Sequence, residues 1–172
     1  MKDLIFLMGM PGSGKSTFGK KLAAKLDYLF LDLDEYIENK TQKTVSELFS
    51  EKGEPFFREL ETLYLTEIIG QKNKLVLSLG GGTPCFNNNI DHIKDFGTSI
   101  FLDAPIKLLA DRILNATTIR PMFKDFSPEQ LILKLEELHK NRCPFYKEAD
   151  IMVNVIDLKL NEVIHLLTKK SF

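Results

Sequence analysis

The stretch Leu4-Ile5-Phe6-Leu7-Met8, followed by Gly9-Met10-Pro11-Gly12-Ser13-Gly14-Lys15-Ser16, decides the fold of this chain. Its first five residues are all apolar, which is typical of a strand that is buried on both faces. The next eight residues fit the pattern G-x-x-x-x-G-K-[ST] of the phosphate-binding loop. From Lys15 to Leu26, apolar residues recur at helical spacing. The loop therefore stands between a strand and a helix, which is the context that its chemistry requires.

This loop predicts a site for a nucleoside triphosphate. Its glycines allow several backbone N–H groups to point toward phosphate oxygens, and the helix N-terminus adds partial positive charge. Lys15 is expected to reach the β- and γ-phosphates, and the Ser16 hydroxyl is expected to bind Mg²⁺. The alternative is a glycine-rich turn that carries Lys-Ser by chance, which the flanking strand and helix disfavour. We expect the ATP contacts of the loop to come from Gly12, Ser13, Gly14, Lys15, Ser16 and Thr17.

The bulk composition is that of an ordinary globular domain. The chain has 172 residues, of which 44% are hydrophobic and 27% charged, and its formal net charge is −1. This length predicts one domain with a substantial core, and the balanced charge gives no indication of nucleic-acid binding. Cys85 and Cys143 lack the C-x-x-C spacing of a zinc site. Because we find neither a signal peptide nor an apolar run long enough to span a membrane, we expect a cytoplasmic protein.

Segments typical of strands and of helices alternate along the chain. Strands are predicted at Leu4–Met8, Leu29–Asp32, Leu75–Leu79, Ser99–Asp103 and Ile151–Val155. Helices are predicted at Lys15–Leu26, Glu35–Asn39, Val45–Lys52, Pro55–Ile69, Asn88–Asp95, Ile106–Leu114, from Ser127 to about Arg142, and at Leu160–Lys169. Thr44 with Glu47, and Ser127 with Gln130, have the spacing of capping boxes. This alternation predicts an α/β fold with helices on both faces of a parallel sheet, whose ligands bind beyond the carboxyl ends of the strands.

Carboxylates and glycines follow the second and third predicted strands. At the end of the second strand, one of Asp32 and Asp34 could order Mg²⁺ and the other could accept a proton from an attacking hydroxyl. Asp34 could instead cap the helix that follows it. Gly80-Gly81-Gly82 follow the third strand and would let a ligand approach the backbone. Since no acidic residue directly follows that strand, we assign the metal to Asp32 together with Ser16.

Three arginines could act on anions. Arg58 lies on an apolar helical segment, where it could either clamp an anion or extend its charge into water. Arg120 lies in residues 115–126, a polar stretch whose length is typical of an active-site lid, with a solvated loop charge as the alternative. Arg142 ends a predicted helix, where an arginine often only complements the helix dipole. The other motifs favour a functional role for Arg120 and Arg142, and the segment around Arg58 leaves both of its alternatives open.

Taken together, these motifs resemble the shikimate kinase family. The resemblance covers nearly the whole chain and rests on the phosphate loop, Asp32-Leu33-Asp34, Phe57-Arg58-Glu59-Leu60-Glu61, Gly80-Gly81-Gly82, Arg120-Pro121 and the run from Arg142 to Asp150. It implies a single P-loop kinase domain over residues 1–172, similar to nucleoside monophosphate kinases, with a five-stranded parallel sheet of order 2-3-1-4-5. It also implies substrate-binding helices at about 34–69 and a lid at about 115–126.

The resemblance further implies transfer of the ATP γ-phosphoryl group to the 3-hydroxyl of shikimate, giving shikimate 3-phosphate and ADP on the chorismate route to the aromatic amino acids. Asp34 would bind substrate hydroxyls and assist deprotonation, and Arg58 and Arg142 would hold the substrate carboxylate. The triple glycine would add backbone contacts. Arg120 would act near the phosphates, and Arg112 would stack on adenine. ATP, Mg²⁺ and shikimate are thus the expected ligands of a monomer, with neither nucleic acid nor a membrane as partner.

Two alternative functions stay open, and the sequence departs from the usual family pattern at three places. A gluconate-type sugar-acid kinase would share the loop and an anionic acceptor, and a non-catalytic regulatory relative would bind the nucleotide alone. Leu79 and Met122 stand where the family usually has Thr and Leu, and the loop near Asp157 lacks an arginine that some members carry.

Overall fold

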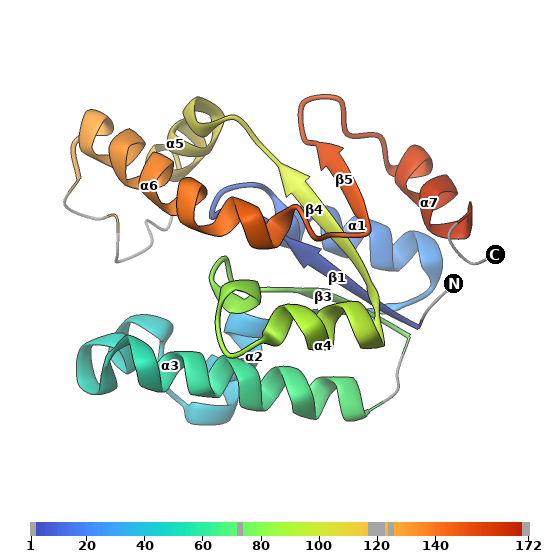
Figure 1. Ribbon diagram of the computed structural model, residues 1–172, viewed down its shortest axis with the longest axis horizontal. Helices are drawn as coiled ribbons and strands as arrows, with labels where there is room; N and C mark the ends of the chain where they lie inside the picture. Colours follow the sequence, from blue (N-terminus) through green and yellow to red (C-terminus); the bar gives the residue numbers. More distant parts are fainter. Residues whose placement is uncertain (1–2, 72–73, 117–122, 124–125, 170–172) are drawn as a thin grey trace.

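A five-stranded parallel sheet forms the centre of the molecule (Figure 1). The computed structural model describes residues 3–71, 74–116, 123 and 126–169. The order of the strands is β2-β3-β1-β4-β5, and every neighbouring pair is parallel. The predicted fold class and strand order are therefore confirmed. The strands are β1 (Leu4–Met8), β2 (Leu29–Asp32), β3 (Leu75–Ser78), β4 (Thr98–Asp103) and β5 (Ile151–Asn154).

Helices cover both faces of this sheet (Figure 1). Alternate residues of β1 point to opposite faces, as in any strand. Ile5 and Leu7 join the apolar cluster of α1 and α7, whereas Leu4, Phe6 and Met8 join the cluster to which α2 through α6 contribute. The bounds are α1 (Lys15–Leu26), α2 (Leu33–Thr41), α3 (Val45–Gly70), α4 (Asn89–Phe96), α5 (Ile106–Leu114), α6 (Pro128–Tyr146) and α7 (Leu160–Lys169), with a 3₁₀ helix, η1, at Thr83–Cys85.

Helix α3 contains a break that the sequence predicts. Gly53 has φ 80° and ψ 170°, which are not helical angles, and Pro55 follows two residues later. Only glycine adopts such a conformation without strain, and proline suits the first turn of a new helical segment. The two helices expected at Val45–Lys52 and Pro55–Ile69 are thus present as two segments of α3.

Side-chain caps fix the beginnings of α2, α3 and α6. Both predicted capping boxes form, at Thr44 with Glu47 and at Ser127 with Gln130. Helix α2 begins at Leu33, two residues earlier than predicted, because the Asp32 carboxylate accepts a hydrogen bond from the backbone N–H of Asp34. Asp32 is therefore the cap, and the suggestion that Asp34 caps this helix is wrong.

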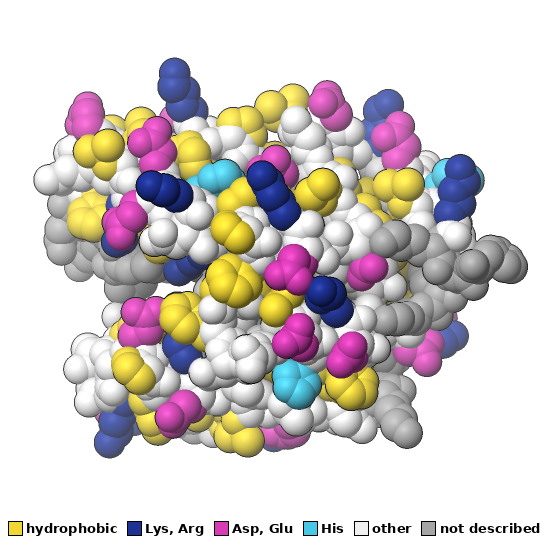
Figure 2. Space-filling view, viewed as in Figure 1, with side chains coloured by type: hydrophobic (Ala, Val, Ile, Leu, Met, Phe, Trp, Pro, Cys, Tyr) yellow, Lys and Arg dark blue, Asp and Glu magenta, His cyan; other side chains and the backbone are white. Residues whose placement is uncertain are grey.

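Basic and acidic side chains are interspersed across the face that Figure 2 shows. In the described part of the chain, we find no helix with the combination of length and apolar character that crossing a bilayer needs.

Candidate active site

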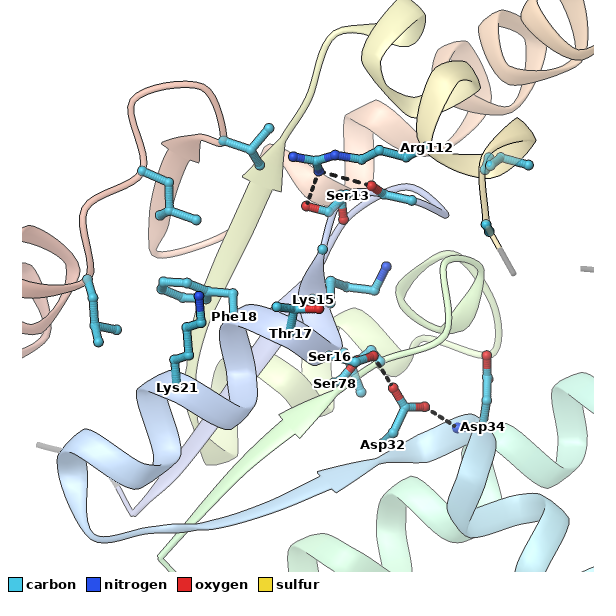
Figure 3. A pocket seen from close by; sticks show the side chains of 18 residues that line it. Ser13, Lys15, Ser16, Thr17, Phe18, Lys21, Asp32, Asp34, Ser78 and Arg112 are labelled. Atoms are coloured by element: carbon cyan, nitrogen blue, oxygen red, sulfur yellow. Dashed lines mark hydrogen bonds between the residues drawn. The ribbon is translucent and has the colours of Figure 1, made fainter. Parts of the chain in front are cut away.

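The phosphate loop forms the floor of a cavity of about 690 Å³ (Figure 3). The cavity lies beyond the carboxyl ends of β1, β2 and β3, where ligands of parallel sheets bind. Gly14, with φ 93°, occupies the position just before α1, and its left-handed backbone turns the chain into the helix. All the residues expected to contact ATP from this loop line the cavity, namely Gly12, Ser13, Gly14, Lys15, Ser16 and Thr17.

Lys15 is buried, and its side chain lies along the loop. Its Nζ donates hydrogen bonds to the carbonyl oxygens of Gly9 at 2.8 Å and Met10 at 3.1 Å. These contacts hold a positive charge within the cavity that Lys15 also lines. A lysine in this place can neutralise phosphate oxygens as a point charge.

Ser16 and Asp32 form the pair of oxygen donors that was predicted to hold Mg²⁺. The Ser16 hydroxyl donates to Asp32 Oδ2 at 2.7 Å, and Asp32 Oδ1 accepts from the Asp34 backbone at 3.1 Å (Figure 3). Among the described residues, no group of three or more His, Cys, Asp or Glu side chains could enclose a metal. Mg²⁺ commonly takes only one or two protein oxygens and completes its shell with phosphate and water. The donor set therefore fits Mg²⁺.

A second cluster surrounds the glycine turn, Gly80–Gly82, which follows β3. A Cβ atom built on Gly80 would stand 2.6 Å from Glu61 Oε1 and 2.9 Å from Asp34 Oδ1. On Gly81 it would stand 2.9 Å from Arg142 Nη1, and on Gly82 it would stand 2.5 Å from the nitrogens of Arg58. Each glycine thus faces a different charged group at a distance that leaves no room for a side chain.

Arg58 is held from several sides. It is only 7% exposed, it forms an ion pair with Glu61, and its Nη2 donates to Glu54 Oε1 at 2.9 Å. Its guanidinium also lies 4.5 Å from the centre of the Phe86 ring, in cation–π contact. The idea that Arg58 extends its charge into water is therefore wrong, because the whole side chain is buried and its guanidinium is paired with Glu54 and Glu61.

Glu61 is the fully buried partner of Arg58. It is 0% exposed, and its Oε1 accepts a hydrogen bond from the Thr83 hydroxyl of η1. Burial raises the pKa of Glu61, while the charge of Arg58 and the hydrogen bonds from Thr83 and Arg58 act in the opposite direction. Glu61 belongs to the motif Phe57-Arg58-Glu59-Leu60-Glu61, but its role as a partner of Arg58 was not predicted. The i, i+3 spacing of Arg58 and Glu61 on a helix was the signal that could have predicted their contact.

Arg142 approaches the same turn from α6. It is 8% exposed, and Tyr146, one helical turn later, donates a hydrogen bond from its hydroxyl to the Gly81 carbonyl oxygen. Two arginines from α3 and α6 and one carboxylate from α2 therefore meet around the glycine turn. That arrangement can bind a small molecule that carries both a carboxylate and hydroxyl groups.

Comparisons with known proteins agree with this geometry. The family model for shikimate kinase matches residues 11–170. The chain belongs to the shikimate kinase family. A shikimate kinase of Azobacteroides pseudotrichonymphae genomovar. CFP2 is 39% identical over 166 residues, which are 96% of this chain and 98% of that protein.

Solved structures of this family share the fold closely. The crystal structure of shikimate kinase from Bacteroides thetaiotaomicron has a TM-score of 0.89 at 36% identity and covers 96% of both chains. Shikimate kinase from Acinetobacter baumannii, solved in complex with shikimate, has a TM-score of 0.85 at 32% identity and covers 97% of this chain and 93% of that one. A gluconokinase from Sinorhizobium meliloti 1021 has a TM-score of 0.55 at 19% identity, a likeness of fold alone. Family membership therefore favours a shikimate kinase over the sugar-acid kinase and regulatory alternatives.

The two remaining predicted arginines differ in what the structure describes. Arg112 lines the cavity, and its Nη1 donates to the carbonyl oxygens of Gly12 at 3.1 Å and Ser13 at 3.3 Å, so it holds the phosphate loop (Figure 3). Arg120 and most of the predicted lid at 115–126 lie outside the described residues. Beyond Arg112, the cavity wall is mainly apolar, through Ile113, Ala116, Val155, Leu158 and Leu160.

Proposed function

We propose that this chain transfers the γ-phosphoryl group of ATP to the 3-hydroxyl of shikimate, giving shikimate 3-phosphate and ADP. One observation carries the proposal together with family membership. Asp34 lines the cavity of the phosphate loop and also lies against Gly80, beside the two arginines of the glycine turn. A carboxylate at this junction can serve an acceptor on one side and a nucleotide on the other.

The acceptor would lie against the glycine turn. Arg58 and Arg142 would hold its carboxylate, since two guanidinium groups present planar donor pairs to an anion. Gly80, Gly81 and Gly82 would let the ring of the acceptor approach the backbone. The complex of shikimate with the related Acinetobacter baumannii enzyme supports the choice of acceptor.

The chemical step would be a displacement at the γ-phosphorus. The 3-hydroxyl oxygen forms a bond to that phosphorus, the bond to the β–γ bridging oxygen breaks with its electron pair leaving on ADP, and Asp34 takes the hydroxyl proton. Lys15 neutralises charge on the β- and γ-phosphate oxygens, and Arg120 would add a cation from the predicted lid. Bound Mg²⁺ supplies further neutralisation of those oxygens, and Ser16 and Asp32 would hold it.

The nucleotide base would lie along the apolar wall of the cavity. Arg112 would border it, with its guanidinium plane available for stacking on adenine while Nη1 stays bound to the loop carbonyls. We also infer that the protein is a monomer, because every group of the proposed site comes from one chain. We infer a cytoplasmic location because both cysteines are free thiols, which a reducing compartment favours. Light scattering of the purified protein tests the monomer.

A coupled assay of ADP release tests the proposed reaction. The wild-type protein is given ATP and Mg²⁺ with shikimate, quinate, gluconate or no acceptor. We expect turnover with shikimate and only a trace of ADP without an acceptor. Equal rates with gluconate, or ADP release that ignores the acceptor, would contradict the proposal.

A double-mutant cycle tests the carboxylate clamp. Arg58→Ala and Arg142→Ala should each weaken acceptor binding by about 2–5 kcal/mol, the scale for breaking a desolvated charge pair, with ATP affinity nearly unchanged. The double variant should lose much less than the sum, because both arginines grip one anion. Simple additivity would show that they do not share it.

A further inference from the structure

Tyr146 is a fully buried residue that lies where the glycine turn, the phosphate loop and strand β4 meet. It lies in the last turn of α6 and is 0% exposed. Its hydroxyl donates to the carbonyl oxygen of Gly81 in the glycine turn and lies 4.0 Å from the sulfur of Met10 in the phosphate loop. Its ring packs against Phe101 of β4, with the ring centres 5.1 Å apart. One side chain thus contacts the glycine turn, the phosphate loop and an inner strand of the sheet.

Tyr146 also lies on the same side of α6 as Arg142. The two residues are four apart on the helix, so they share one face, and the positive charge of Arg142 acts on the Tyr146 hydroxyl by lowering its pKa. Arg142 Nη1 in turn lies 2.9 Å from the point that a Cβ of Gly81 would occupy. The Tyr146 hydroxyl and the Arg142 guanidinium therefore meet at the same glycine, Gly81.

The state of this hydroxyl suits a structural donor. Burial raises the pKa of Tyr146 well above its ordinary value, and the positive charge of Arg142 offsets only part of that rise. The group consequently keeps its proton at neutral pH and donates it to the Gly81 carbonyl oxygen. A buried carbonyl that lost this donor would carry an unmet desolvation cost.

We propose that Tyr146 is a positioning residue, which sets where Arg142 and the Gly81 backbone stand relative to the phosphate loop and so places the acceptor for transfer. The inference rests on the proposed function, because it assigns the acceptor carboxylate to Arg142. Tyr146 touches neither the reacting hydroxyl nor the phosphates, and it acts through Arg142 and Gly81 alone.

Tyr146→Phe tests this role, because it removes the hydroxyl and keeps the ring. We expect the KM for shikimate to rise by roughly tenfold, the size of one buried hydrogen bond, with the KM for ATP changed less than about twofold. The matched control is Tyr28→Phe, which removes the hydroxyl of a half-buried tyrosine that packs against the apolar cluster of α1 and α7. It should leave both KM values unchanged.

A double-mutant cycle with Arg142→Lys adds a measurement of the shikimate KM that a purely structural role of Tyr146 would not change. Lysine keeps the charge and loses the planar donor pair, so Tyr146→Phe should raise the shikimate KM far less in the Arg142→Lys background than in the wild type. Independent, additive effects of the two substitutions would overturn the inference.

The remaining outcomes separate this inference from the proposed function. A wild-type protein that does not phosphorylate shikimate would overturn the proposed function and this inference with it. Two kinetic outcomes would overturn the inference alone, provided that the wild type is active. In the first, Tyr146→Phe leaves the shikimate KM unaltered; in the second, it raises the KM values for shikimate and ATP equally. A Tyr146→Phe chain that cannot fold even with ATP present would also overturn it, since the hydroxyl would then serve the fold rather than the acceptor.

Discussion

The substitution Gly82→Ala isolates the contact between the glycine turn and Arg58. Gly82 has φ −92° and ψ −20°, a conformation that alanine adopts freely, so the backbone itself is not strained. The added Cβ would instead stand 2.5 Å from the Arg58 guanidinium nitrogens. An ordinary contact needs about 3.5 Å, so the guanidinium must withdraw by about 1 Å.

That withdrawal should impair the acceptor step selectively. Glu54, Glu61 and Phe86 hold Arg58 in place, so its movement also strains these contacts and should destabilise the fold by about 1–3 kcal/mol, as overpacking does. A misplacement of about 1 Å in a substrate-holding group can cost up to roughly 10²-fold. We therefore expect kcat/KM for shikimate to fall by about 10- to 100-fold, while the KM for ATP stays within about twofold.

Gly70→Ala is the matched control. Gly70 lies at the end of α3, and nothing stands within 4 Å of the point that its Cβ would occupy. This substitution should leave both substrates unaffected and should stabilise the protein by about 0.4–1 kcal/mol. The assay is initial-rate kinetics with each substrate varied in turn, together with urea unfolding of all three proteins. Wild-type acceptor kinetics in Gly82→Ala would refute the claim that this glycine makes room for Arg58.

Four further substitutions address the phosphate side of the site. Lys15→Met should nearly abolish turnover and leave the circular dichroism spectrum unchanged, because Lys15 serves phosphate charge; an unaltered rate would contradict the nucleotide assignment. Asp34→Asn should lower kcat even at saturating Mg²⁺, whereas added Mg²⁺ should partly restore the activity of Asp32→Asn. If both variants respond alike to Mg²⁺ titration, the assignment of the proton to Asp34 and of the metal to Asp32 is wrong. Arg120→Ala should lower kcat by on the order of 10³–10⁵-fold or somewhat less, with dissociation constants nearly unchanged; a near-normal kcat would mean that another cation serves the phosphates.

The sequence predicts the sheet well because its signals are local. Each strand is a short apolar run, and the faces of β1 follow directly from the alternation of its residues. The capping boxes and the break at Gly53 are likewise set by neighbours in the chain. The start of α2 was misplaced because Asp32 and Asp34 are both good caps, and only the three-dimensional turn decides which carboxylate meets the free N–H. The 3₁₀ helix at Thr83–Cys85 was not predicted, since a single turn leaves no periodicity to detect.

The candidate site likewise has a part that local sequence predicts and a part that depends on distant segments. The phosphate loop is built mostly from its own backbone, so eight consecutive residues predict it. The glycine turn depends on side chains that arrive from distant segments, such as Glu61 on α3 and Tyr146 on α6. Their roles rest on contacts 22 and 65 residues apart in the chain, and a sequence pattern does not encode such distances. The residues that we propose to bind ligands are therefore predicted by the sequence, whereas the residues that hold them in place are found only in the structure.

The strand order explains why an acceptor and a nucleotide can meet in this protein. Strand β3 lies between β2 and β1, and the register pairs Ser78 of β3 with Asp32 of β2 and with Leu7 of β1. The three strands therefore end at the same level. The glycine turn leaves β3 with Asp34 beside it on the β2 side and the phosphate loop beside it on the β1 side. A group bound at the turn would thus be adjacent both to the carboxylate that we propose takes its proton and to the loop that we propose holds the phosphates. Any sheet order that separated β2 or β1 from β3 would break one of these two contacts, so the geometry of transfer is set by the topology before any side chain is placed.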